Sequence, residues 1–343
     1  MKTGKLIKRL LALSFAFVMV ISTLTGCGKK DSGLTHVTLN EVAHSIFYAP
    51  QYVAIENGYF AEEGIDLELV TGFGADKTMS ALVSGEADIG FMGAESSVYL
   101  YSEGASNYAV NFAQLTQRAG NFLVARKPIE DFTWDMLKDK DVLGGRKGGM
   151  PEMVFEYILK KNDINPSEDV RINQSIDFGS TAAAFSGGQG DFTVEFEPAA
   201  TALETAGEGY VVASLGVDSG YVPYTSYSTT KEYLAENEAT VKKFTKALQK
   251  GMEYVNTHTP KEIAEVIAPQ FEETDVETIE KIVTRYYEQD TWKDNLVFEE
   301  SSFDLLQNIL SDAGELSNRV PYDNLVDTRF AEEAYKEAAK KGK

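Results

Sequence analysis

The sequence has 343 residues, 43% of them hydrophobic, so the chain can bury a large core, and its length fits two lobes better than one compact unit. This composition argues against a disordered chain. With 32 basic and 53 acidic residues the net charge is −21, and such a negative surface repels phosphate backbones and anionic lipid head groups, which argues against nucleic acid as a partner.

Residues 1–26 predict a targeting segment that is not part of the fold. Basic residues at positions 2, 5, 8 and 9 are followed by the apolar run LLALSFAFVMVIS. The segment ends in LTGC, which resembles the lipobox of bacterial lipoproteins, where lipid is attached to the cysteine and the leader is cut before it. By this resemblance Cys27 is the lipidation site, and residues 27–34 form a polar tether.

Lipidation at Cys27 also sets the expected location. A diacylated cysteine supplies the two chains that stable anchoring needs, so we expect a domain held by membrane lipid at the outer face of a bacterial cell membrane. The alternative is an uncleaved signal anchor. It fits less well, because the polar stretch GKKDSG follows at once and no second apolar span of about 20 residues exists. Cys27 is the sole cysteine, which excludes an internal disulfide.

After the tether, predicted strands alternate with predicted helices. Residues 36–42 have apolar positions with a period of two and predict a strand. Pro50 opens a predicted helix that ends at Gly58. Residues 65–69 alternate apolar and acidic side chains, which predicts a half-buried strand. Residues 76–91, DKTMSALVSGEADIGF, predict a helix, a glycine break and a strand, and together these elements form a parallel crossover.

The second half of the chain follows the same pattern. Residues 141–162 predict a short strand, a glycine-rich turn and a helix, and residues 170–176 predict a further strand. Residues 179–194, GSTAAAFSGGQGDFTV, then predict the helix and strand of a second crossover. From about residue 230 onward the sequence predicts helices without intervening strands. We expect these helices to pack on an existing sheet.

Residues 179–194 repeat residues 76–91 at a spacing of 103 positions. Ligands of α/β folds bind at the sheet edge where such crossovers end, so two copies predict two lobes that face each other across a cleft. The alternative is that strand–helix–strand units look alike in any α/β protein. The identical pairs in the aligned stretch are Thr78 and Thr181, Ala81 and Ala184, Gly85 and Gly188, and Asp88 and Asp191.

Longer stretches carry a family resemblance. YAPQYVAIENGYFAEEGIDLELV (48–70) followed by SALVSGEADIGFMG (80–93) resembles the opening of the ABC-transporter solute-binding family that includes the sulfonate, nitrate, taurine and thiamine-pyrimidine-precursor binders. NFLVARKP (121–128), the glycine-rich turn and GYVPYTSYSTTKEYLAENEATVKKFTKAL (220–248) continue the resemblance in order. It covers nearly the whole mature chain.

The resemblance implies a type II periplasmic-binding-protein fold of the α/β class. Each lobe would be a mostly parallel sheet flanked by helices, and two crossing strands would join the lobes. The first lobe would comprise residues 35–124 plus 225–343, and the second residues 125–224. A monomer of this kind closes its cleft on a small molecule and presents it to a membrane permease, without catalysis.

The resemblance also places the ligand-binding residues. In the family the site is built from the turn before the first helix, the turn after the ADIGF strand, the glycine-rich turn of the second lobe and the end of its repeat strand. Aromatic and Met side chains can sandwich a flat ring, and carboxylates accept hydrogen bonds from ring amino groups, which favours an aminopyrimidine of the thiamine-precursor type. These positions carry His44, Phe47, Tyr48, Met92, Gly93, Glu95, Ser96, Arg146, Lys147, Gly148, Gly149, Met150, Thr193, Glu195 and Glu197.

Other interpretations of these residues stay open. Arg146 beside free amides at a helix start would also serve a small anion such as an alkylsulfonate, and a flavin is a further alternative. The three glutamates would repel an anion if they face the same cleft, which favours a neutral or cationic ligand. His44 could be a capping residue, and Glu95 could complement a helix N-terminus. Strand alternation predicts that one of Glu195 and Glu197 points inward and the other into solvent.

Two functions of other classes compete with ligand capture for a permease. Yeast pyrimidine-precursor synthases resemble these binders, but they carry a cysteine-rich segment, whereas the sole cysteine here is Cys27. The three histidines, His36, His44 and His258, have no metal-ligand spacing, so we expect no metal, no cofactor and no enzyme activity. A sensory module that signals to a membrane receptor stays open as the second rival.

Overall fold

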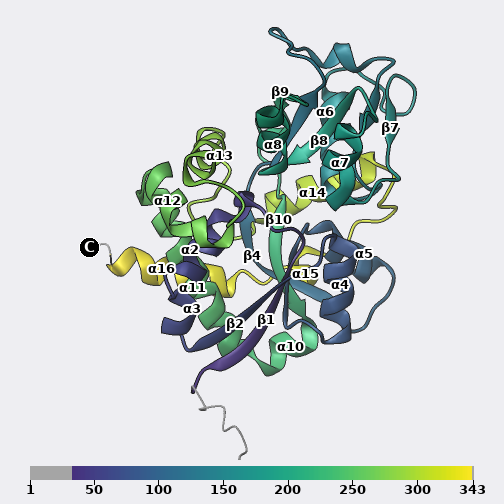
Figure 1. The fold of residues 1–343 in the computed structure, drawn as a ribbon. Helices are drawn as coiled ribbons and strands as arrows, with labels where there is room; N and C mark the ends of the chain where they lie inside the picture. The colour runs from purple at the N-terminus through teal and green to yellow at the C-terminus, as the bar shows by residue number, and fades with distance from the viewer. Residues whose placement is uncertain (1–32, 342–343) are drawn as a thin grey trace, which may run out of the picture. The chain divides into compact units, whose positions relative to one another are not determined.

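The computed structural model describes residues 33–341 (Figure 1). The predicted leader, residues 1–26, and the predicted lipidation site, Cys27, lie outside the described residues. The chain divides into two units after Leu34, and every element below belongs to the second unit, which begins at Thr35. Within residues 33–341 no helix is both long and apolar enough to cross a lipid bilayer.

The first sheet has five strands in the order β2-β1-β3-β10-β4. β1 pairs in parallel with both β2 and β3, whereas β10 is antiparallel to β3 and to β4, so β10 alone runs against the other four strands. The bounds are β1 (Thr35–Glu41), β2 (Ile65–Thr71), β3 (Ile89–Met92), β4 (Ala109–Thr116) and β10 (Thr225–Thr230).

The second sheet also has five strands, in the order β7-β6-β8-β5-β9. β6 is parallel to β7 and β8, and β5 is antiparallel to β8 and β9, so β5 alone is reversed. The two sheets therefore share one topology, and the predicted mostly parallel sheets are confirmed. The bounds are β5 (Asn121–Ala125), β6 (Asp141–Leu143), β7 (Arg171–Asn173), β8 (Phe192–Phe196) and β9 (Tyr210–Ser214).

The sequence repeat has a structural counterpart. In the first copy α4 (Ala75–Ser84) leads into β3, and in the second copy α7 (Thr181–Ser186) leads into β8. β3 and β8 each stand third in their sheet, beside the reversed strand. The repeat thus supplies the same crossover once to each lobe.

The reversed strand of each sheet is the first strand that the chain forms after it crosses from the other sheet. β5 of the second sheet follows β4 of the first, and β10 of the first sheet follows β9 of the second. The chain passes from β4 to β5 over residues 117–120, and it returns through α9 (Leu215–Ser219) to β10. Where the two crossing segments meet, the hydroxyl groups of Thr116 and Thr225 are 2.5 Å apart, and the Thr225 amide donates to Thr116 Oγ1 at 3.0 Å. These bonds hold the crossing segments side by side.

Helices cover both sheets (Figure 1). In the first lobe α4 and α5 lie on one side of the sheet, and α2, α3 and α11 lie on the other. α14 comes late in the chain but packs against α6 of the second lobe. The remaining bounds are η1 (Ile46–Tyr48), α2 (Ala49–Glu56), α3 (Tyr59–Glu62), α5 (Glu95–Ser102), η2 (Trp134–Leu137), α6 (Met150–Lys161), η3 (Phe178–Ser180), α8 (Ala199–Ala206), α10 (Lys231–Glu236), α11 (Glu238–Thr257), α12 (Pro260–Ile267), η4 (Ala268–Gln270), α13 (Val276–Glu288), α14 (Glu300–Asp312), α15 (Tyr322–Leu325) and α16 (Arg329–Lys341).

One hydrophobic cluster runs through both lobes. Its centre is aromatic: the Phe47 ring lies 5.1 Å from Tyr48, 5.7 Å from Phe196, 5.7 Å from Tyr224 and 5.3 Å from Tyr286 between centroids. Phe196 comes from the second sheet, whereas Phe47 and Tyr48 precede α2 of the first lobe. The lobes are therefore joined by buried rings as well as by the crossing segments.

We expect Gly251→Ala to destabilise the fold. A Cβ at Gly251 of α11 would lie 2.2 Å from the Pro50 carbonyl oxygen and 3.1 Å from Ala54 Cβ, so α11 and α2 would have to separate. Overpacking costs about 1–3 kcal/mol, and alanine regains up to about 1 kcal/mol in helix propensity. The free energy of unfolding, measured by urea denaturation, should fall by about 1–2 kcal/mol.

The control for this substitution is Lys243→Ala, on the exposed face of the same helix. It should change the free energy of unfolding by less than about 0.5 kcal/mol. If Gly251→Ala were as stable as the wild type, α2 and α11 would not be packed as closely as described.

Candidate functional site

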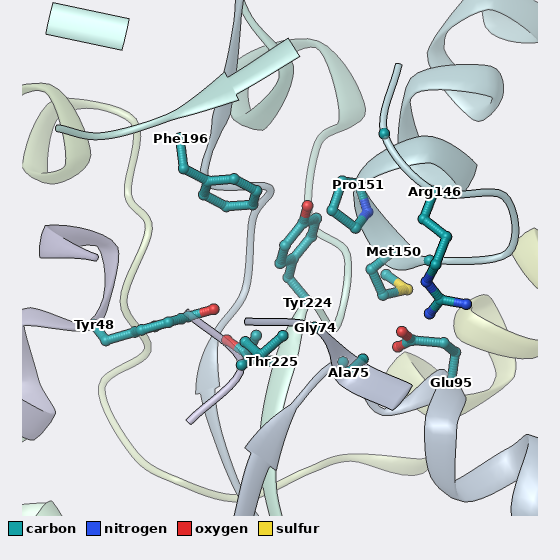
Figure 2. A pocket seen from close by; sticks show the side chains of 14 residues that line it. Tyr48, Gly74, Ala75, Glu95, Arg146, Met150, Pro151, Phe196, Tyr224 and Thr225 are labelled. Carbon is teal, nitrogen blue, oxygen red and sulfur yellow. The ribbon is translucent and has the colours of Figure 1, made fainter. Parts of the chain in front are cut away.

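The candidate site is a pocket at the carboxyl ends of the parallel strands of both sheets, which is where α/β folds bind ligands (Figure 2). The free space between its lining residues is about 560 Å³, a figure that includes the solvent-open space at its mouth. The first lobe contributes Val42, Tyr48, Gly74, Ala75, Gly93, Glu95 and Thr225, the second contributes Gly145, Arg146, Gly149, Met150, Pro151 and Phe196, and the crossing segment contributes Tyr224.

Aromatic side chains form one wall of the pocket (Figure 2). Tyr48 ends η1, and the Pro50 that follows it favours the start of α2, so the local sequence fixes where this ring stands. Burial raises the pKa of Tyr48 and Tyr224 far above the usual range, so both hydroxyl groups keep their protons. The Tyr224 hydroxyl donates to Asn121 Oδ1 at 3.3 Å. The wall can therefore stack a flat ligand, and the Tyr224 hydroxyl, whose one proton is given to Asn121, can accept a further hydrogen bond.

Glu95 is the acidic group of the pocket. It is the first residue of α5, its side chain is buried with 1% exposure, and its Oε2 atom has no hydrogen-bond partner. A Cβ at Gly93 would lie 1.9 Å from Oε2, so only glycine at position 93 leaves room for the carboxyl group. Burial raises the pKa of Glu95 to about 7, although the amides of Glu95 and Met150 and the charge of Arg146 act in the opposite direction.

The glycine-rich turn before α6 faces Glu95. Figure 2 shows the Arg146 guanidinium group above the Glu95 carboxyl group, with Met150 beside them. Arg146 Nε also lies 3.7 Å from Asp76 Oδ1 across the cleft. Tyr99 of the first lobe donates to the Gly148 carbonyl at 2.9 Å, so the turn is held from both lobes.

The same turn depends on a second buried carboxyl group. The Gly148 amide donates to Glu152 Oε2 at 3.1 Å, and Gln174 Nε2 donates to Glu152 Oε1. Burial and the neighbouring Glu156 raise the pKa of Glu152 to about 8. Glu152 therefore supports the turn from behind and does not line the pocket.

A second cavity adjoins the pocket and shares the Phe196 side chain with it. His44, Phe73, Glu195 and Glu197 line this second cavity. The predicted ligand-binding residues are thus divided between two neighbouring cavities. Tyr48, Gly93, Glu95, Arg146, Gly149 and Met150 line the first.

Glu195 is buried at the end of β8. The hydroxyl groups of Thr193 and Thr181 donate to its carboxyl oxygens at 2.6 and 3.1 Å. Burial raises the pKa of Glu195 to about 7 despite these two bonds. Neutral hydroxyl groups thus hold a carboxyl group that titrates in the neutral range.

His44 belongs to a bonded network around Glu41. Its Nδ1 atom lies 2.8 Å from Glu41 Oε1, and its Nε2 atom lies 2.7 Å from the Gln270 carbonyl oxygen. Burial lowers the pKa of His44, but the bonds to Glu41 and Gln270 outweigh it and the pKa is raised. Both ring nitrogens face acceptors, so the charged imidazolium fits this position best.

Glu197 has a structural role. Its carboxyl group accepts hydrogen bonds from the amide and hydroxyl of Thr201, at 2.9 Å each, and from Arg285 Nη1 at 2.7 Å. The expectation that one of Glu195 and Glu197 faces solvent is wrong, because both are buried. Side chains two positions apart in a strand point to the same face, so alternation does not separate Glu195 from Glu197, and β8 itself ends at Phe196.

The other predicted residues lie around the two cavities. Phe47 is buried behind the aromatic wall, and Thr193 donates to Glu195. Met92 packs in a separate apolar cluster with Ala75, Met79 and Leu82. Ser96 is buried in α5, Gly148 lies in the glycine-rich turn, and Lys147 is exposed and pairs with Glu315 at 3.5 Å.

Sequence reasoning missed several residues that line the cavities. Tyr224 stands within the stretch 220–248 that carried the family resemblance, but nothing in that stretch marks it as a cleft residue. Phe196 lies between Glu195 and Glu197, the two glutamates that the resemblance predicts to bind the ligand. Phe73 follows β2 in a left-handed conformation, φ 56°, which is uncommon for a bulky side chain and which the sequence does not signal.

Comparisons with known proteins agree with this geometry. The family described as "NMT1/THI5 like" matches residues 46–263. A Bacillus subtilis (strain 168) protein named "Putative binding protein YtlA" is 45% identical over 332 residues, which is 96% of this chain and 99% of that protein.

Solved structures show the same fold at low sequence identity. The alkanesulfonate-binding protein SsuA of Xanthomonas axonopodis pv. citri, bound to MOPS, superposes with a TM-score of 0.70 at 14% identity, over 86% of this chain and 98% of that one. The periplasmic nitrate-binding protein NrtA of Synechocystis PCC 6803 gives 0.70 at 15%, over 90% and 89%. The predicted periplasmic-binding-protein fold is confirmed, and the chain belongs to the NMT1/THI5-like family.

Proposed function

We propose that the protein is the extracytoplasmic solute-binding component of an ABC importer. It captures a small aromatic heterocycle of the aminopyrimidine type between its two lobes and delivers it to a membrane permease. The names of its relatives support the general role, since they are a binding protein, an alkanesulfonate-binding protein and a nitrate-binding protein. The ligand class is argued from the pocket itself.

The unpartnered Glu95 oxygen carries the proposal. Buried polar atoms in proteins are nearly always hydrogen-bonded, and Glu95 Oε2 is buried without a donor. A ligand N–H group in the pocket would supply the missing donor. The rings of Tyr48, Phe196 and Tyr224 stand around the same space and can stack on a flat ring (Figure 2). An aromatic ring that carries an amino group satisfies both features.

The position of the pocket provides the transport mechanism. Its lining comes from both lobes, so a ligand contacts both and stabilises their closed arrangement. A permease can then distinguish the closed, loaded form from the open one. Ligand binding alone accounts for this role, and we propose no turnover.

The proposal includes anchoring through Cys27. A lipid on this residue would keep a monomeric domain at the outer surface of the membrane, next to its permease. Both the anchor and the monomeric state follow from the sequence resemblance.

We expect an aminopyrimidine to stabilise the protein in a thermal-shift screen that also contains thiamine, flavins, sulfonates, nitrate and small amines. A ligand at about 1,000 times its dissociation constant adds about 4 kcal/mol of stability. An increase in Tm with sulfonates or nitrate, and none with aminopyrimidines, would contradict the ligand class. It would favour a site for small anions built on Arg146.

We expect Glu95→Gln to weaken aminopyrimidine binding by about 10- to 100-fold, because a hydrogen bond to a charged group contributes about 1.5–3 kcal/mol. The wild-type affinity should rise between pH 6 and 8, since the carboxylate is the stronger acceptor and the pKa of Glu95 is raised to about 7. Isothermal titration calorimetry measures both effects.

The matched control is Glu103→Gln, the same exchange at the exposed C-terminal end of α5. It should leave the affinity and its pH dependence unchanged. If the wild type and Glu95→Gln bound the aminopyrimidine equally at pH 8, Glu95 would not be a ligand contact.

A further inference from the structure

The N-terminus of α6 has the features of an anion site. α6 has 12 residues, and its N-cap residue, Gly149, has no side chain to bond the first amides. Unsatisfied amides and the helix dipole together attract negative charge. Arg146 stands beside these amides and adds a fixed positive charge (Figure 2). A ligand carrying a carboxylate or sulfonate group would suit this position.

A side chain from the opposite lobe already faces this position. Glu95 of α5 points its carboxyl group at the start of α6, where the Met150 amide interacts with it (Figure 2). The side chain is 1% exposed, and one of its oxygens is unpartnered. The missing Cβ of Gly93 is what allows the carboxyl group to occupy this space. Two residues of the first lobe thus place a negative group at the helix N-terminus of the second.

We propose that Glu95 acts as a built-in anion, which occupies the place of a ligand's anionic group at the α6 N-terminus and so excludes anionic solutes from the cleft. This inference deepens the proposed function and rests on the same site. A second anion would have to enter a buried space beside an ionised carboxylate. A neutral or cationic ligand meets no such repulsion and can donate to the free oxygen.

The exclusion depends on the charge of Glu95, so the charged and titratable groups around it matter. The neighbouring tyrosines stay neutral, since burial raises their pKa values well above the usual range. Arg146 is the positive group, and Asp76 shares it at 3.7 Å. Glu152 bonds the Gly148 amide behind the turn. The charged and titratable groups that face Glu95 or its turn are Tyr48, Asp76, Tyr99, Arg146, Lys147, Glu152, Tyr224 and Glu315.

The direction of the pH effect follows from burial. The pKa of Glu95 is raised to about 7, so the ionised form dominates at pH 8 and the protonated form at pH 5.5. Protonation removes the built-in anion and turns the carboxyl group into a donor. Anion exclusion should therefore be strongest at pH 8 and relax as the pH falls.

The test uses methanesulfonate, whose charge is constant over this pH range, and dimethyl sulfone as an uncharged probe of similar size. Calorimetric titration at pH 8 should show methanesulfonate binding at least tenfold tighter to Glu95→Gln than to the wild type. Adding Arg146→Gln to that variant should abolish the gain. If only the protonated form of Glu95 admits the anion, a pKa of about 7 makes the wild type bind methanesulfonate about tenfold tighter at pH 5.5 than at pH 8, with no such change for dimethyl sulfone.

The matched control is Glu103→Gln, the same exchange at the exposed C-terminal end of α5, away from both cavities. It should not gain methanesulfonate binding. A folded Glu95→Gln variant without any gain would overturn the inference. So would a wild type that binds methanesulfonate equally at both pH values, and this second measurement needs no variant to fold.

The two proposals can fail separately. If aminopyrimidines bind but Glu95→Gln gains no anion, the proposed function stands and the role of Glu95 in exclusion is refuted. If Glu95→Gln gains methanesulfonate binding but no aminopyrimidine binds the wild type, the exclusion stands and the proposed ligand is refuted.

Discussion

Two buried carboxyl groups constrain the cleft, because the fold holds both of them out of water. Glu95 comes from the first lobe and Glu195 from the second, and burial raises the pKa of both to about 7. Since both pKa values lie above the ordinary value of 4.5, the folded protein holds these protons more tightly than the unfolded chain, and its stability falls as the pH rises from about 4.5 to about 7. This loss of stability comes from groups that line the two cavities. Donors on a bound molecule would offset it.

The lobes are held together by contacts that need no ligand. Phe47 sits among rings from both lobes, and Arg285 of α13 bonds Glu197 and Glu204 of the second lobe at 2.7 Å each. Ser45 also donates to the Glu197 carbonyl at 2.6 Å. These contacts preorganise the aromatic wall, because Phe196 is the residue before Glu197. Less conformational entropy is then lost when a ligand binds.

Much of the fold follows from local sequence signals. The strand at 65–69 alternates because one face is solvated, and Pro50 marks the start of α2 because its fixed φ suits a first helical turn. The helix–strand repeat indicated two equivalent crossovers. β4 shows no alternation between buried and exposed residues that could predict a strand, since all eight of its residues are buried. Two of its polar residues bond partners far along the chain: Asn111 donates to the Leu325 carbonyl, and Thr116 bonds Thr225.

The site was harder to predict from the sequence than the fold, because the role of each side chain there depends on partners far along the chain. Positions near the strand ends could be selected, and six of those residues line one pocket. Glu95 and Glu197 carry the same functional group at equivalent sheet edges. The Glu197 carboxylate bonds Arg285, 88 positions later, which neutralises its charge. The Glu95 carboxyl group lies at the start of α6, and its Oε2 atom has no hydrogen-bond partner. Whether a carboxylate is neutralised by a cation or keeps an oxygen without a partner is therefore set by tertiary packing, and only the folded arrangement reveals it.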